Sequence, residues 1–246
     1  MIVLQWRGGK PALLKAFIRF TFLKGLHSSQ NLLRKPAFTL AEVLITLAII
    51  GIVAALTILT LVQAYNKRIV ETRLKHFYVI INQAVRLSEA EYGPFEGWNS
   101  MIDSSDAHSL EKWWNTYFAP HIKTLRIERV SSNRIRVYLY DGSKCYFTVG
   151  FGQSTTSKSI HLYFYPKANS KTEIMGKDYF TFYIHSGVNM KYLPVEPYKF
   201  NWDGTESSLK SGGYGCYTTP SGTRHYCTAL IQYNNWKIPD DYPYKF

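Results

Sequence analysis

The chain has 246 residues, and 46% of them are apolar, which is enough for one moderate domain and a membrane segment. Its formal net charge of +12 is uneven, because seven basic residues and no acidic residue precede position 38, and the remainder carries 22 basic and 17 acidic residues. The overall charge therefore gives little reason to expect nucleic-acid binding, and three cysteines exclude a CxxC…CxxC zinc framework.

The first predicted element is a membrane-spanning helix. Val43–Val62 is a run of 20 residues without a charge, and at about 1.5 Å per residue it spans the hydrocarbon core of about 30 Å. Arg34 and Lys35 precede it and Lys67 and Arg68 follow it, with the larger basic block on the N-terminal side. The positive-inside rule therefore predicts a single pass with the N-terminus in the cytoplasm and the bulk of the chain outside.

Glu42 is the unusual residue of this segment. A lone carboxylate at the membrane edge is unfavourable, so we expect it to have a partner. No basic residue lies within one helical turn on its C-terminal side. A free α-amine on Phe38 would supply the positive charge if the chain were cut between Ala37 and Phe38.

Residues 35–61, KPAFTLAEVLITLAIIGIVAALTILTL, resemble the N-terminus of the type IV prepilin family, which includes the pilins and the pseudopilins of type II secretion. The resemblance implies that a membrane peptidase cuts between Ala37 and Phe38 and methylates the new amine of Phe38. It also implies that Glu42 pairs with the amine of a neighbouring subunit when the helices stack. Ala37 stands where the family usually has glycine, so we expect slower processing.

For function, the resemblance implies a structural subunit of a type II secretion pseudopilus or a type IV pilus-like filament. Such a subunit takes part in protein secretion or pilus formation. Such a subunit starts in the bacterial inner membrane and then enters a periplasmic or extracellular filament. Its expected partners are other copies or other pilins, the prepilin peptidase, an inner-membrane assembly platform and membrane lipid. The resemblance does not indicate which filament system is involved, or whether the subunit is major or minor.

The helical pattern continues beyond the apolar run. Val70, Leu74, Phe77, Ile81, Ala84 and Val85 recur at steps of three and four, while polar residues such as Glu71 and Asn82 occupy the other positions. Gly93-Pro94 is a helix stop. We therefore expect one helix over residues 39–92, about 80 Å long.

The rest of the chain predicts an α+β head of the type IV pilin kind. The sequence of Asp106–Phe118 predicts a short helix with an acidic N-cap. Alternating residues predict strands at 134–140, 145–149, 160–164 and 180–184, with a hairpin turn at Asp141-Gly142. An antiparallel sheet packed on the amphipathic part of the helix accounts for this order, and residues 150–159 read as a polar loop.

Four segments are therefore expected. Residues 1–37 form a basic leader that is removed, 38–65 a transmembrane and polymerisation helix, 66–93 its amphipathic continuation, and 94–246 a globular periplasmic or extracellular head. From Ser186 onward we expect turns and aromatic packing rather than regular elements.

The head offers few candidate sites. Export would allow a disulfide between Cys216 and Cys227, whereas no role is predicted for Cys145. Asp203 and Glu206 are the candidates for a calcium ion, although a solvated turn is the favoured interpretation, and no other cofactor is expected. The sequence contains no HExxH, G-x-S-x-G, Walker or Rossmann motif, so nothing in it indicates an enzyme.

Two other functions stay open. A DNA-capturing competence pilin would need a basic, aromatic stripe on the head, for which Arg126, Arg129, Arg134 and Arg136 are the candidates. Basic residues on a sheet are more often a solvated face, so nucleic acid is not the expected partner. The third hypothesis is a membrane-anchored head domain that never polymerises.

Overall fold

The computed structural model describes residues 38–103, 106, 108–150, 159–170, 172–184, 194–218 and 223–246. The chain divides into two units, one that ends at Ile52 and one that comprises Val53–Phe246. The predicted loop at 150–159 lies almost entirely outside the described residues, and so does the leader at 1–37.

The long helix α2 spans Leu40–Tyr92, 53 residues, close to the predicted 39–92. Its apolar stripe is confirmed, because Val70, Leu74, Phe77, Ile81, Ala84 and Val85 are all buried. Gly93 ends the helix with a φ of 82°, and its N–H donates to the Glu89 carbonyl. A positive φ at this position is the reason why glycine follows the last helical turn.

Glu71 and Asn82 of α2 are buried, although the periodicity places them outside the apolar stripe. Glu71 is 7% exposed and Asn82 is 5% exposed. The Glu71 carboxylate accepts hydrogen bonds from Lys237 Nζ and the Ile238 N–H, each at 2.9 Å. The Asn82 amide bonds both backbone groups of Val195, at 2.9 and 3.1 Å. The C-terminal part of the chain packs over this flank of the helix, which a helical pattern cannot reveal.

Six antiparallel strands form one sheet in the order β1-β2-β3-β4-β5-β6. They are β1 (Thr124–Ser131), β2 (Arg134–Leu139), β3 (Lys144–Gly150), β4 (Ser159–Tyr165), β5 (Phe180–Ile184) and β6 (Val195–Pro197). The four predicted strands correspond to β2, β3, β4 and β5. Strands β1 and β6 were not predicted: the pairing of β1 contains two irregularities, and β6 has three residues.

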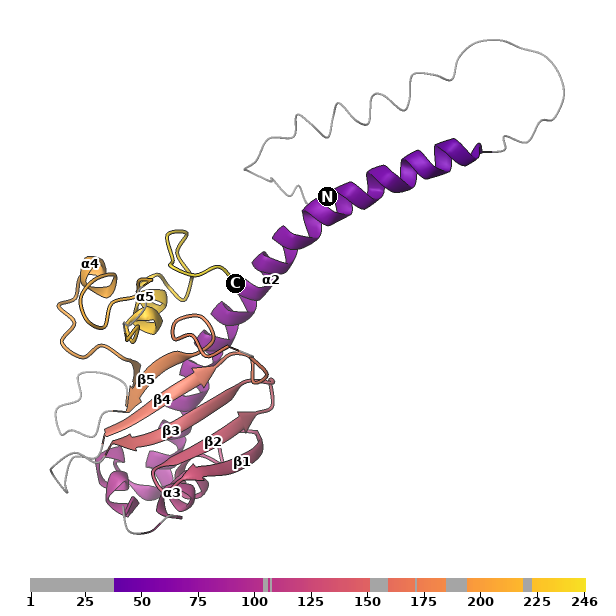
Figure 1. Cartoon of the computed structure of the whole chain (residues 1–246). Coiled ribbons are helices and arrows are strands. Elements are labelled where there is room, and N and C mark those ends of the chain that lie inside the picture. Colours follow the sequence, from indigo (N-terminus) through magenta and orange to yellow (C-terminus); the bar gives the residue numbers. More distant parts are fainter. Residues whose placement is uncertain are drawn as a thin grey trace, which may run out of the picture. The chain divides into compact units, whose positions relative to one another are not determined.

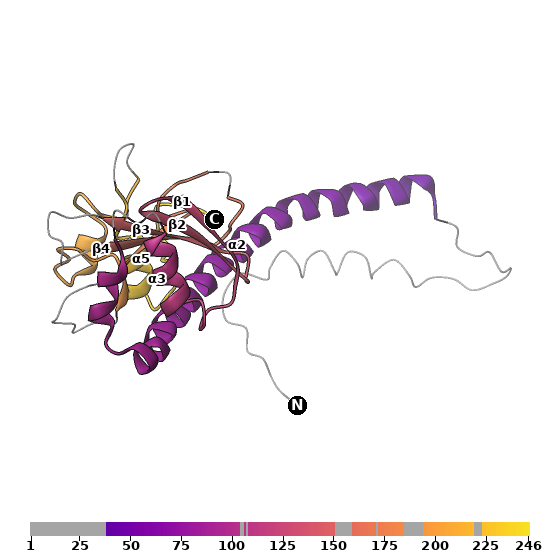
Figure 2. The ribbon, with the colours of Figure 1, turned by 90° about the horizontal axis from the view of Figure 1, so that it is seen from below.

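One face of the sheet packs against α2. Phe77 stacks on Phe164 with ring centroids 4.3 Å apart and meets Phe182 edge-on at 5.2 Å. The alternate residues Ile135, Val137, Cys145, Phe147 and Leu162 are buried on the same side. Figures 1 and 2 show this part of α2 running along the back of the sheet. The architecture is the α+β, pilin-like one that the sequence predicts.

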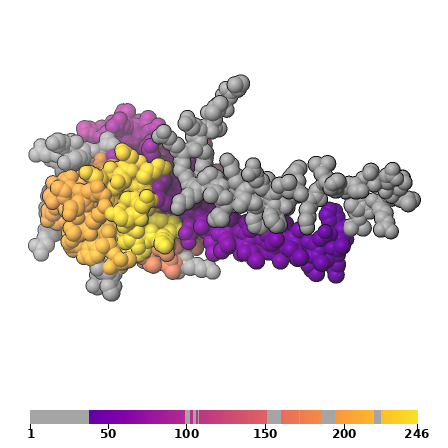
Figure 3. Space-filling model, turned by 90° about the horizontal axis from the view of Figure 1, so that it is seen from above, coloured from indigo at the N-terminus to yellow at the C-terminus, as the bar shows by residue number. Residues whose placement is uncertain are grey.

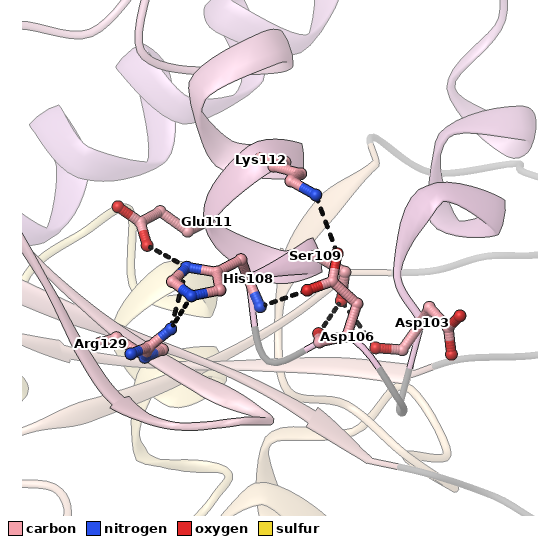
Figure 4. A network of polar contacts seen from close by, with 7 residues as sticks. All are labelled: Asp103, Asp106, His108, Ser109, Glu111, Lys112 and Arg129. Atoms are coloured by element: carbon pink, nitrogen blue, oxygen red, sulfur yellow. Dashed lines mark hydrogen bonds and ion pairs between the residues drawn. The ribbon is translucent and has the colours of Figure 1, made fainter.

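A short 3-10 helix, η1 (Phe95–Met101), and helix α3 (Ser109–Tyr117) precede the sheet. The predicted acidic N-cap is wrong, because His108 occupies the cap position and α3 starts three residues after Asp106. The Asp106 carboxylate instead accepts a hydrogen bond from the His108 N–H at 2.8 Å. Figure 4 shows this turn, with Arg129 of β1 reaching the His108 ring and Lys112 bonding Asp106.

The C-terminal region contains two short helices, α4 (Glu206–Leu209) and α5 (Cys227–Tyr233). A disulfide joins Cys216 to Cys227. The Thr181 N–H of β5 donates to Thr228 Oγ1 at 2.9 Å, which attaches α5 to β5. Figure 3 shows this region, orange to yellow, at the surface of the head, and Trp236, just after α5, contacts Tyr78 of α2 with ring centroids 5.0 Å apart.

Candidate functional site

The start of α2 is the first candidate site. Ala37 lies outside the described residues, and Phe38 is 84% exposed. Glu42 Oε2 accepts hydrogen bonds from the Thr39 N–H at 3.0 Å and the Thr39 hydroxyl at 2.9 Å. The Glu42 N–H donates to Thr39 Oγ1 at 3.3 Å. This reciprocal pattern is a capping box, in which two side chains bond backbone N–H groups that have no partner inside the helix.

This capping box was not predicted, although its signature, Thr39 followed three residues later by Glu42, is visible in the sequence. In the single subunit the carboxylate is therefore hydrogen-bonded locally, and the helix start is stable before any partner arrives. A hydrogen bond to a threonine supplies no positive charge. The need of Glu42 for a cation in an apolar environment remains.

The apolar half of α2 presents a continuous exposed apolar surface. Among the described residues, α2 is the one helix long and apolar enough to cross a membrane. From Leu40 to Tyr65 no side chain is buried. An apolar surface of this size is stable only in lipid or against other helices.

The polar side chains of this segment are satisfied inside the helix. Thr46, Thr57 and Thr60 each donate their hydroxyl to a backbone carbonyl three or four residues earlier, at 2.9 to 3.0 Å. Such bonds hide a hydroxyl from an apolar environment. Glu42 is the one ionisable residue between Phe38 and Gln63, so it is the group that an environment of lipid or helices must accommodate.

The two calcium candidates are engaged in local contacts. Asp203 Oδ1 accepts hydrogen bonds from the Thr205 N–H and hydroxyl, each at 2.8 Å, and from the Ser208 hydroxyl. These hydrogen bonds, the one from Ser208 first, lower the pKa of Asp203. Glu206 forms an ion pair with Lys210 at 2.7 Å. Thr205 is the N-cap of α4, so this pair of acids organises a turn.

The described residues contain no group of three or more His, Cys, Asp or Glu side chains placed to hold a metal ion. The third cysteine, Cys145, is a buried free thiol in β3. Burial raises the pKa of the Cys145 thiol, and a buried thiol is a poor nucleophile because little thiolate forms. Cys145 is therefore a core residue.

The four arginines that the sequence groups together divide between two places. Arg126 and Arg136 face Tyr138 and Glu128 across β1 and β2, on the side of the sheet away from α2. Arg134 is two residues before Arg136 on β2 and shares that face. Arg129 pairs in register with the buried Ile135, so its side chain lies on the side of the sheet that faces α2, where it contacts His108.

Comparisons with known proteins give two matches. Residues 60–246 match the family described as "Family of unknown function (DUF6613)", and residues 33–58 match the prokaryotic N-terminal methylation motif. No curated protein and no solved structure matches the chain. The methylation motif covers Ala37, Phe38 and Glu42, confirms the resemblance to prepilins and supports a pilin-like or pseudopilin subunit. Because the first match covers more than half of the chain, this protein belongs to the DUF6613 family, and its N-terminus is of the prepilin type.

Proposed function

We propose that this protein is the structural subunit of a type II secretion pseudopilus or a type IV pilus-like filament. In this proposal a prepilin peptidase cuts between Ala37 and Phe38 and methylates the Phe38 amine. Residues 38–65 then serve first as a single-pass anchor, with the N-terminus in the cytoplasm, and later as the filament core. Residues 66–93 continue the helix, and residues 94–246 form the head on the far side of the inner membrane.

The observation that carries this proposal is the exposed apolar surface of α2 with one carboxylate at its start. Leu44, Ile50 and Leu56 are 58%, 62% and 69% exposed, so the surface must be covered by lipid or by other helices. A plain anchor needs no ionised group inside this surface. In a stack of staggered helices Glu42 has a role, because the amine of one subunit can neutralise the carboxylate of the next.

The attachment of the head supports the same proposal. Glu71, Asn82 and Ser88 lie on α2 and hydrogen-bond the C-terminal tail, β6 and the Tyr117 carbonyl. These buried bonds fix the second half of α2 to the head. Packing of the helices would therefore set the arrangement of the heads.

Mass spectrometry of the protein extracted from membranes tests the proposal. The expected mass is that of residues 38–246 plus one methyl group, with residues 1–37 absent. Ala37→Gly is the matched control, because it restores the usual residue before the cut and should be processed at least as fast. An intact leader in both proteins would contradict every filament interpretation and favour a plain anchored domain.

Assembly is tested separately with Glu42→Ala. We expect this variant to insert and to be cleaved, but to yield at least tenfold less sheared filament, since a neighbour's amine loses its counter-charge. Normal filament yield from Glu42→Ala would show that the carboxylate is not needed for assembly.

A further inference from the structure

The face of the sheet away from α2 carries a cluster of cations and tyrosines on its first three strands. In the register of the sheet, Arg126 lies opposite Tyr138, Tyr138 opposite Lys144, and Arg136 opposite Tyr146. We call this surface the Arg–Tyr face and define it by Arg126, Arg134, Arg136, Tyr138, Lys144 and Tyr146. In Figure 1 the sheet lies in front of α2, so the reader looks onto this face over β1, β2 and β3.

The cations of this face are held over tyrosine rings. Arg126 lies 4.2 Å from the ring centroid of Tyr138, and Arg136 lies 4.8 Å from that of Tyr146. Lys144 lies 4.6 Å from the ring centroid of Tyr165 on β4. Cation–π contacts of this kind hold a charged group in place without neutralising it. The cations are therefore pre-positioned, which lowers the entropy lost when a ligand binds.

The charge of the face is only partly balanced. Glu128 is the one acid among the described residues that forms ion pairs with these cations, with Arg126 at 3.0 Å and with Arg136 at 2.8 Å. Arg134 donates to the Thr148 hydroxyl at 2.9 Å. Neither Arg134 nor Lys144 forms an ion pair within the described part of the chain. Four cations and one acid paired with them leave an excess of positive charge on this face.

Among the described residues, His225 and Tyr198 cover the other end of this side of the sheet, at β4 and β5. The Thr181 hydroxyl of β5 meets His225 at 3.2 Å, and the Thr181 N–H bonds Thr228. Tyr198, just after β6, packs against His161 and His225. Over β1, β2 and β3, the cations keep access to solvent, with the Arg126 side chain 61% exposed.

We propose that the Arg–Tyr face binds an acidic polysaccharide through its carboxylate groups. Arginine recognises carboxylates with two parallel N–H donors, which matches the guanidinium groups that this face presents. That the Arg–Tyr face points outward from a filament rests on the proposed function. Because α2 packs on the opposite side of the sheet, a filament with α2 in its core places the Arg–Tyr face outside. An external polymer is therefore a better fit than a second subunit.

Nucleic acid is the less favoured polyanion. Bases bind sheet surfaces by stacking on open aromatic faces, and here the rings of Tyr138, Tyr146 and Tyr165 already lie under cations. Duplex DNA carries about one charge per 1.7 Å. The Cα atoms of Arg134 and Arg136 are about 7 Å apart on one strand, so the face matches a polymer with sparser charges.

Binding of the full-length protein in non-ionic detergent to immobilised alginate tests this proposal, with neutral dextran and duplex DNA as the other ligands. We expect binding to alginate that weakens between about 50 and 200 mM salt, weaker binding to duplex DNA and none to dextran. The double variant Arg134→Gln/Lys144→Gln should bind alginate roughly tenfold more weakly, because it loses two charge-assisted contacts. The matched control Lys75→Gln/Lys245→Gln makes the same charge change elsewhere and should bind like the wild type.

Glu128→Gln excludes misfolding as the explanation, since removal of the one acid should make binding about threefold tighter, and a misfolded protein would not gain affinity. Equal binding by the double variant and its control would overturn the proposal, as would tighter binding to DNA than to alginate at the same salt. The assay uses dispersed subunits, so it depends on neither cleavage nor assembly. A Glu42→Ala protein that fails to polymerise should still bind alginate.

Discussion

At the scale of single residues, Glu42 caps a helix in the described chain and has a second role in the proposed filament. Its carboxylate caps α2 through Thr39, and the proposed filament requires its negative charge. Glutamine can replace glutamate in a capping box, whereas only glutamate can neutralise an amine. The two uses therefore respond differently to substitution.

We expect Glu42→Gln to keep the helix start and to lose filament assembly. Thr39→Val should do the opposite, because it removes the cap, a change of about 1 kcal/mol, and keeps the charge. Sheared filament measured against total cleaved subunit gives the comparison. If Glu42→Gln assembled normally while Thr39→Val did not, capping rather than charge pairing would be the role of Glu42.

His225 makes the stability of the head depend on pH. It lies between Thr181 and Tyr198, where burial, with a smaller effect of the nearby His161 charge, lowers its pKa from 6.5 to about 4. Between these two values the unfolded chain binds the proton and the folded chain does not, so stability falls as the pH falls below about 6.5 and levels off near 4. Above 6.5 the residue contributes no pH dependence.

Partial exposure of His225 reduces the effect of its pKa shift on stability. We therefore expect the free energy of unfolding to fall by about 1 kcal/mol on going from pH 7 to pH 5. The measurement is the free energy of unfolding of wild type and His225→Gln at both values. Since carboxylates titrate in both proteins, the difference between them isolates the histidine. An equal pH dependence would show that His225 has the same pKa in the folded and the unfolded chain.

At the scale of elements, local pattern explains which parts of the fold could be predicted. The stripe of α2 and the alternation of β2 to β5 follow from one buried face each. β1 does not alternate, because it is an edge strand with irregular pairing and an exposed pattern. β6 is too short for any period, and Asn82 defines its position by bonding Val195.

The residues of the candidate sites likewise fall into those that a local sequence pattern predicts and those that it does not. Phe38 and Glu42 follow from the N-terminal motif, which is local in the sequence. The division of the arginines follows from strand register, and Arg129 faces the other way because β1 pairs it with Ile135. No pattern in residues 124–131 marks this register, so only the paired structure reveals it.

Asn82 should therefore be the residue on which the docking of β6 depends. Asn82→Ala leaves both buried backbone groups of Val195 without a partner, and we expect a loss of about 2–3 kcal/mol in the free energy of unfolding. Gln83→Ala is the matched control, because this neighbour is exposed and should change stability by less than about 0.5 kcal/mol. Chemical denaturation measures both, and a loss below 1 kcal/mol for Asn82→Ala would contradict this account.

At the scale of the whole molecule, one helix has two halves with different requirements. Residues 40–65 expose their apolar side chains, while the stripe from Val70 to Val85 is buried against the sheet. The first half therefore requires lipid or other helices, and the second half is complete within one chain. A membrane anchor that later becomes a filament core satisfies both requirements without refolding the head.

This arrangement predicts the redox state of the head in the cell. If residues 94–246 lie outside the cytoplasm, Cys216 and Cys227 are in a compartment where their disulfide persists, whereas a cytoplasmic head would keep them reduced. Cells quenched with acid and treated with an alkylating reagent under denaturing conditions should therefore show one reactive thiol, Cys145, and two more after reduction. Cys145→Ala, which removes the free thiol, should show none before reduction. Three reactive thiols in the wild type would place the head in the cytoplasm, and the proposed topology and the filament would both have to be abandoned.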